Sequence, residues 1–165
     1  MRTIREIEKI VQSELFTISL PEIVAAIKPL LVTPTMHLRN WDYGQPGEAY
    51  HCWTVLEHPE SDTAIVYSDD GFGPTCPWGL VGLSASDKWF GMDSGWFRTL
   101  EDAFCDSFAV SDLPIWNLVR HDPDGSHSVV ETTLSLDNAC EKANSFNSRR
   151  QKPTDGPFCF VELRR

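Results

Sequence analysis

The chain has 165 residues, 41% of them hydrophobic and 23% charged, and carries a net charge of −10 at pH 7. These proportions are typical of a globular domain, so we expect a single domain over residues 1–165. The acidic balance excludes most nucleic-acid and anionic-membrane binding, because no basic face is available to neutralise phosphates. The expected partners therefore include neither nucleic acid nor membrane.

The N-terminal portion, residues 1–35, is predicted to be helical. Apolar residues recur at helical spacing over residues 3–15, which predicts an amphipathic helix. A second helix is predicted after Ser19, because Ser19 and Glu22 have the spacing of a capping box. Pro29 limits the length of this second helix.

The following portion, residues 36–165, is predicted to be rich in strands. Aromatic and β-branched residues predict strands at 36–42, 49–57, 63–67 and 78–84. The second and third of these flank a His-Pro-Glu-Ser-Asp turn, which predicts a hairpin. A second hairpin, 115–120 with 128–134, surrounds an Asp-Pro-Asp-Gly turn.

Two later helices are predicted near residues 100–110 and 136–147, capped by Thr99 and Ser135. A closing strand is predicted at 158–163. Together these elements indicate an α+β fold: a mainly antiparallel sheet of five to seven strands, with two N-terminal helices and two later helices packed on it.

The acids gather in the middle of the chain. Residues 40–87 carry eight Asp and Glu residues and no Lys or Arg, and all six Trp residues lie between 41 and 116. Such a segment attracts basic surfaces. The alternative is a solvated acidic face that keeps the protein soluble without any partner.

The aromatic residues also allow two interpretations. Trp53, Trp78 and Trp116 fall in predicted strands and are expected to supply core. Residues 89–97 hold five large apolar side chains with no clear period, so this segment either covers the core or forms an exposed binding patch. The expected partner-binding residues are Asp42, Glu48, Asp69, Asp70, Trp89, Phe90, Asp93, Trp96 and Phe97.

No catalytic or metal motif is complete, so we predict no catalytic residue, no metal and no cofactor. The glycines near residue 71 lack the third glycine of a dinucleotide fingerprint. His121 and His127 can face each other across a hairpin, but two imidazoles alone make an incomplete zinc site. Cys76 lies among acids, whereas a nucleophilic cysteine needs a base or a cationic neighbour. The five widely spaced cysteines are typical of reduced thiols, which predicts a cytoplasmic protein.

The function that these features favour is an acidic binding or inhibitor domain, such as an immunity-type neutraliser of a basic toxin or a nucleic-acid mimic. Its acids would steer a basic protein partner and its aromatic residues would anchor it. The alternative is a small enzyme or ligand-binding domain with a pocket assembled from dispersed His, Cys and Asp residues. A third possibility is a structural subunit of a larger assembly.

Overall fold

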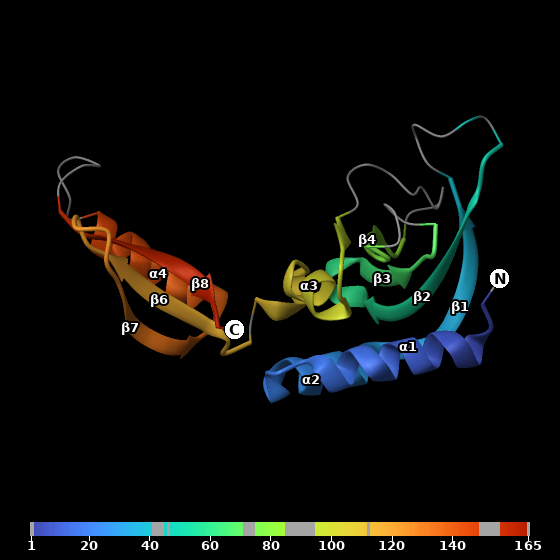
Figure 1. The fold of residues 1–165 in the computed structure, drawn as a ribbon. Coiled ribbons are helices and arrows are strands. Elements are labelled where there is room, and N and C mark those ends of the chain that lie inside the picture. Colours follow the sequence, from blue (N-terminus) through green and yellow to red (C-terminus); the bar gives the residue numbers. More distant parts are fainter. Residues whose placement is uncertain are drawn as a thin grey trace. The chain divides into compact units, whose positions relative to one another are not determined.

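The computed structural model describes residues 2–40, 45, 47–70, 75–84, 95–111, 113–148 and 156–164. It has the predicted α+β fold with antiparallel strands (Figure 1). The described strands form two sheets: a five-stranded sheet in the order β1-β2-β3-β4-β5 and a three-stranded sheet in the order β7-β6-β8. The chain divides into two compact units, Met1–Ala109 and Val110–Arg165, each of which contains one sheet. That the whole chain is a single domain stays a prediction.

Helix α1 (Ile4–Thr17) confirms the first predicted helix. Its capping box is complete: the Thr3 side chain accepts a hydrogen bond from the Glu6 amide, and the Thr3 amide donates to Glu6 Oε2 at 2.7 Å. Ile7, Val11 and Leu15 recur at helical spacing and form its buried face.

Helix α2 (Pro21–Ile27) starts one residue later than the predicted capping box requires. Its N-cap residue is Leu20, whose apolar side chain makes no capping hydrogen bond. The prediction that Ser19 caps this helix was therefore wrong, because Pro21 is the first helical residue and sets the start of the helix. A 3₁₀ turn, Lys28–Leu30, follows and contains Pro29.

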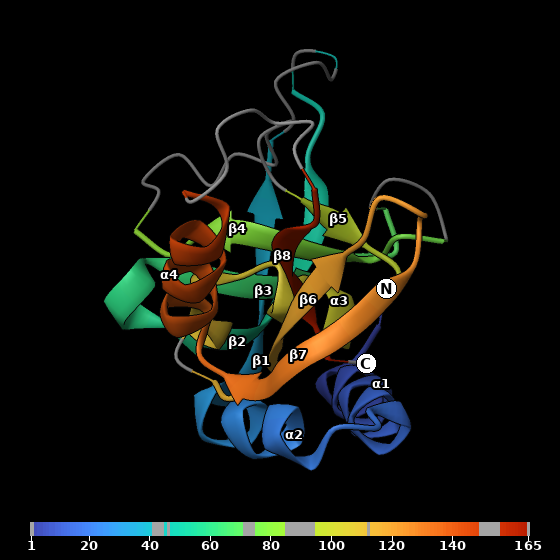
Figure 2. The same cartoon turned by 90° about the vertical axis from the view of Figure 1, so that its left-hand side faces the viewer.

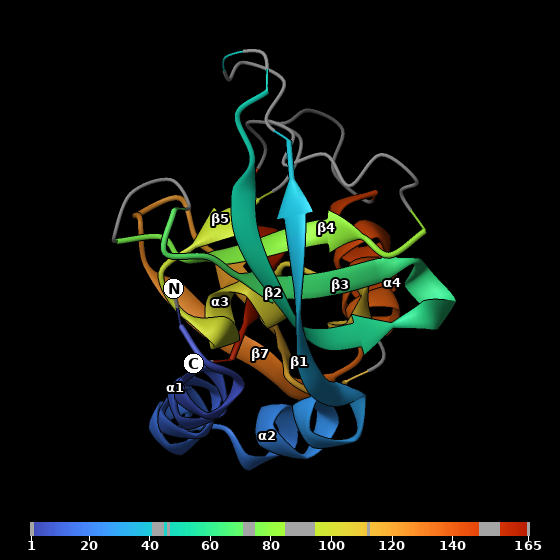
Figure 3. The ribbon, with the colours of Figure 1, turned by 90° about the vertical axis from the view of Figure 1, so that its right-hand side faces the viewer.

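The first sheet contains β1 (Leu31–Arg39), β2 (Tyr50–His58), β3 (Thr63–Tyr67), β4 (Trp78–Gly82) and β5 (Trp96–Phe97). Figure 3 shows β1 to β4 as neighbouring strands, with α1 and α2 below them. The first strand begins five residues before the predicted start. Sequence patterns missed residues 31–35 because they contain Pro34, which a strand tolerates at a sheet edge, where β1 lies.

The predicted hairpin between β2 and β3 is confirmed. A 3₁₀ turn, Pro59–Ser61, joins the two strands, and Asp62 adopts a left-handed conformation with φ of 52°. The Asp62 carboxylate then accepts hydrogen bonds from the Ser84 amide (2.8 Å) and hydroxyl (2.6 Å). This acid therefore holds together the hairpin and the segment after β4.

The two faces of the first sheet bury different side chains. Trp53, Tyr67 and Trp78 are paired across β2, β3 and β4 and share one face. Trp78 is fully buried against Tyr67, with ring centroids 5.1 Å apart. The opposite face carries a compact cluster of Cys52, Ala64, Val66 and Val81, with Tyr50, Leu83 and Trp96 at its border. Trp53 and Trp78 therefore supply core, as expected.

Helix α3 (Leu100–Cys105) is fastened to α1 within the first unit. Thr99 caps it by accepting a hydrogen bond from the Asp102 amide, as predicted. Glu14 of α1 accepts a second bond from the Leu100 amide at 2.8 Å. Together these acceptors satisfy two amides of the first turn, which otherwise have no partner inside the helix.

The second unit is a hairpin, a helix and a closing strand: β6 (Trp116–His121), β7 (His127–Leu134), α4 (Leu136–Asn147) and β8 (Phe158–Leu163) (Figure 2). Helix α4 packs on the sheet over a core that includes Leu118, Leu134, Ala139, Ala143 and Cys159. Trp116 borders this core and is only partly buried.

The predicted hairpin of the second unit is confirmed as well. His121 pairs with His127 at its turn, and their ring centroids are 4.6 Å apart. Phe158 packs beside His121 with ring centroids at 4.8 Å. The two imidazoles are therefore part of an aromatic cluster on the sheet.

The cysteines all lie in the described part of the chain, and each is a free thiol. Cys52 and Cys159 are buried, and Cys140 is exposed. Among the helices of the described ranges, none combines the length and the apolar character that crossing a bilayer requires.

Candidate functional site

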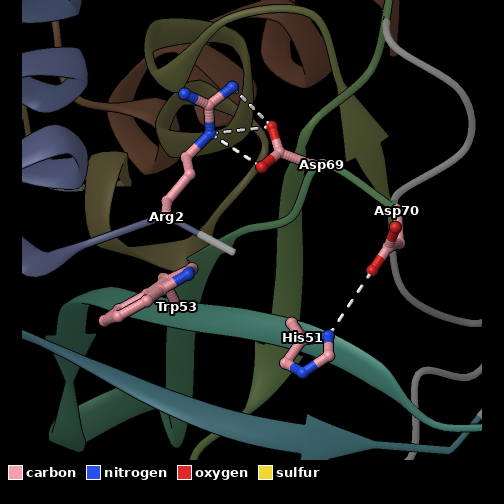
Figure 4. Close-up of a pocket in the computed structure, with 5 residues that line it drawn as sticks. All are labelled: Arg2, His51, Trp53, Asp69 and Asp70. Carbon is pink, nitrogen blue, oxygen red and sulfur yellow. Dashed lines mark hydrogen bonds and ion pairs between the residues drawn. The ribbon is translucent and has the colours of Figure 1, made fainter.

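A pocket of about 260 Å³ lies in the first unit and is lined by Arg2, His51, Trp53, Asp69 and Asp70 (Figure 4). Four of these five side chains are polar or charged. They come from three distant parts of the chain, so the fold, and not a local motif, brings them together.

The strand geometry explains this convergence. His51 and Trp53 are two residues apart on β2, so their side chains point to the same face of the sheet. Strand β3 runs antiparallel to β2 and ends at Tyr67, which pairs with Trp53. Asp69 and Asp70 come just after the end of β3 and therefore lie at the same end of the sheet as the start of β2.

Arg2, which immediately precedes the cap of α1, forms a fork-shaped ion pair with Asp69. Arg2 Nε lies 2.7 and 2.8 Å from the two carboxylate oxygens, and Nη2 lies 2.6 Å from Oδ1. The Tyr67 hydroxyl donates a further hydrogen bond to Asp69 Oδ1 at 3.0 Å. Partial burial opposes ionisation of Asp69, but the bonds from Arg2 and Tyr67 prevail and lower its pKa. Asp69 is therefore a charged and already partnered carboxylate.

Asp70 presents a second carboxylate, which differs from Asp69 in its ion-pair partner. Its Oδ2 lies 3.8 Å from His51 Nδ1, an ion pair only when the imidazole is protonated. Both side chains are about half exposed, at 51% for Asp70 and 41% for His51. Among the described residues, no Lys or Arg forms an ion pair with Asp70.

A buried hydroxyl fixes the backbone beneath Asp70. The Ser68 hydroxyl donates to the His51 carbonyl at 2.9 Å and accepts from the Asp70 amide at 3.1 Å. Ser68 is fully buried. The Ser68 hydroxyl thus links the backbone of Asp70 to the backbone of His51.

The structure brings together only some of the residues that the sequence predicted for partner binding. Asp69 and Asp70 line the pocket. Glu48 is exposed, and its Oε2 accepts a hydrogen bond from the Gln45 amide at 2.8 Å. Trp96 and Phe97 form β5, which pairs with β4 in the sheet. The remaining predicted residues, Asp42, Trp89, Phe90 and Asp93, lie outside the described residues.

The described acids of residues 40–87 form two groups at the two ends of β2 and β3. Glu48, Asp69 and Asp70 lie where β2 begins and β3 has ended. Glu57 and Glu60 lie at the hairpin end of the same two strands, together with Asp62. Antiparallel pairing therefore sends the described acids of this segment to opposite ends of the two strands.

Arg2, His51 and Trp53 of the pocket are not among the partner-binding residues expected from the sequence. The alternation along β2 would have placed His51 and Trp53 on one face, since residues i and i+2 of a strand share a face. Arg2 had no usable signal, because it lies 67 residues away from Asp69 in the sequence. The Arg2–Asp69 ion pair therefore brings a positive charge to residues 40–87, a segment that contains no Lys or Arg of its own.

The chemistry of the pocket suits a cation. Beside the Arg2–Asp69 ion pair, the Asp70 carboxylate, an imidazole and an indole can surround an ammonium or guanidinium group. In the parts of the chain that the structure describes, no group of three or more His, Cys, Asp and Glu side chains is arranged to hold a metal ion. No protein-family model, no curated protein and no solved structure matches this chain.

Proposed function

We propose that this chain is an acidic binding domain that recognises a basic protein, and that a Lys or Arg side chain of this partner enters the pocket at Asp70. The proposal rests on one observation: the pocket contains two carboxylates, and among the described residues a Lys or Arg pairs with Asp69 alone. Asp70 has no Lys or Arg partner among the described residues and is half exposed.

The size and lining of the pocket support a single side chain as the ligand. Its volume of about 260 Å³ is below the range of about 300–1,000 Å³ that is usual for small-molecule sites. Trp53 offers an apolar wall along which the methylene stem of a Lys or Arg can lie. The charged end of that side chain would then meet the Asp70 carboxylate.

The charge distribution supports the same partner. Residues 1–109 contain 16 acids and seven Lys and Arg residues, a balance of −9, whereas residues 110–165 contain eight acids and seven bases, a balance of −1. The acidic field therefore originates in the unit that contains the pocket. Such a field accelerates the approach of a basic protein and weakens as salt is added.

We predict that Asp70→Asn weakens binding of the basic partner by about 2 kcal/mol or more, because it leaves the partner's cation without a counter-charge in the contact. Glu60→Gln is the matched control: it removes the same charge at the opposite end of β2 and β3. It should slow association slightly and leave dissociation unchanged. A partner captured from cell extract and measured by surface kinetics at low and high salt would provide both rates.

The proposal predicts that association of the unmodified protein slows steeply with salt. If both variants changed affinity equally, the acids would act only as a diffuse field and the pocket would have no special role. If the association rate did not respond to salt, electrostatic steering would be excluded. Asp69→Asn is a poorer test, because it leaves Arg2 without its partner.

A second candidate is a small-molecule binding domain that uses the same pocket. It is favoured by the convergence of His51, Asp69 and Asp70 from dispersed positions. Here the ligand would be a small amine rather than a side chain of a protein. Native mass spectrometry of the purified chain distinguishes the two: a retained small molecule, lost in Asp70→Asn, would favour this second candidate.

A further inference from the structure

Arg39 is a buried cation that has no ion-pair partner among the residues that the structure describes. The residue is only 5% exposed, and its Nε and Nη1 atoms are buried without any hydrogen bond. Among the described residues, no Asp or Glu forms an ion pair with it. Buried Arg residues are almost always paired, because removing an unpaired charge from water is strongly unfavourable.

The strand register places Arg39 on the face opposite Trp53. Arg39 pairs directly with Tyr50, and its neighbour two residues earlier, His37, pairs with Cys52. Directly paired residues of antiparallel strands point to the same side. Arg39 therefore lies on the face of the Cys52, Ala64, Val66 and Val81 cluster, and outside the pocket at Asp70.

The described neighbours Cys52 and Ser68 do not neutralise Arg39. Burial raises the pKa of the Cys52 thiol to about 12, so this nearest sulfur is uncharged at pH 7. The Ser68 hydroxyl on the same face is already committed to the His51 carbonyl and the Asp70 amide. Burial lowers the pKa of Arg39 itself, yet a guanidinium stays protonated at neutral pH.

We propose that Arg39 is the anchor of a binding site for a small oxyanion, namely a carboxylate or phosphate group. An oxyanion supplies both what the guanidinium lacks, a negative charge, and acceptors for its unsatisfied N–H groups. A small ligand is required, because a side chain that is 95% covered cannot meet the flat surface of a macromolecule. The site is independent of the cation pocket, since the two lie on opposite faces of the sheet.

The test uses the full chain in a chloride buffer at fixed ionic strength, titrated separately with sodium phosphate and sodium acetate. The thermal midpoint Tm should rise saturably, by about 3–6 °C at ten times the dissociation constant of the better anion. The stronger of the two responses identifies whether the group is a phosphate or a carboxylate. Arg5→Met, at an exposed position of α1, should behave like the unmodified protein.

Arg39→Met should abolish the response to both anions. Its Tm in chloride alone should be no lower than that of the unmodified protein, because the variant no longer buries an unpaired charge. An unchanged anion response in Arg39→Met, or no saturable response in the unmodified protein, would overturn the proposal. If Arg39→Met does not fold, the NMR signal of the Arg39 Nε–Hε group in the unmodified protein provides the test. This signal should shift saturably with phosphate or acetate, and a constant signal would refute the site.

Discussion

Phe104→Ala is expected to destabilise the protein by about 3–5 kcal/mol, as is usual when a fully buried aromatic side chain is truncated in a core. Phe104 lies on α3 and has no exposed surface. Its removal leaves a cavity where α3 packs in the first unit. Since the free energy of unfolding of small domains is only about 5–15 kcal/mol, this single substitution would remove a large part of the stability of the protein.

The chain offers a matched control for this prediction. Phe16→Ala makes the same chemical change on α1, where the Phe16 side chain is 91% exposed. It should alter the free energy of unfolding by no more than about 0.5 kcal/mol. Urea unfolding of both variants measures the difference. Equal losses for the two variants would contradict the placement of Phe104 in the core.

Gly79→Ala should destabilise the protein by about 1–3 kcal/mol through overpacking. A Cβ atom at this position would lie 2.9 Å from two ring carbons of Trp96, closer than real Cβ contacts allow. Gly79 pairs directly with Trp96 across β4 and β5, so the glycine makes room for the indole to lie flat on the strand. The ring must therefore move if the methyl group is added.

A double-mutant cycle isolates this contact. In a Trp96→Ala background the indole is absent, and Gly79→Ala should then cost less than about 0.5 kcal/mol. Chemical unfolding of the four proteins gives the coupling energy. A cost that is the same in both backgrounds would attribute the effect to the backbone of β4. The result also bears on partner binding, because an indole held against Gly79 has less freedom to anchor a partner.

Local signals predicted the elements that depend on neighbouring residues. The apolar spacing of α1 and the turn between β2 and β3 are readable over a few positions. The start of β1 was not readable, because Pro34 is usually a strand breaker and its tolerance depends on β1 being an edge strand. The division of the strands into two sheets is likewise a property of long-range pairing.

The candidate sites were predicted only in part for the same reason. Asp69 and Asp70 were expected at a binding site because of their charge. The partner of Asp69, however, is Arg2, which lies near the N-terminus of the chain and far from Asp69 in the sequence. In the sequence, Arg39 is a single basic residue in a predicted strand, a pattern that does not by itself indicate a binding site. Its significance lies in its burial and in the lack of a partner among the described residues, neither of which a sequence records.

An NMR titration with a short peptide that contains one Arg and no acids tests the cation pocket most directly. Saturable shifts are expected for the Trp53 indole N–H and the His51 ring, which line the pocket, and both should be lost in Asp70→Asn. Glu60→Gln, at the hairpin end, should leave the shifts intact. Shifts at Glu57 and Glu60 as large as those at Trp53, or shifts that survive Asp70→Asn, would contradict the pocket as the recognition site.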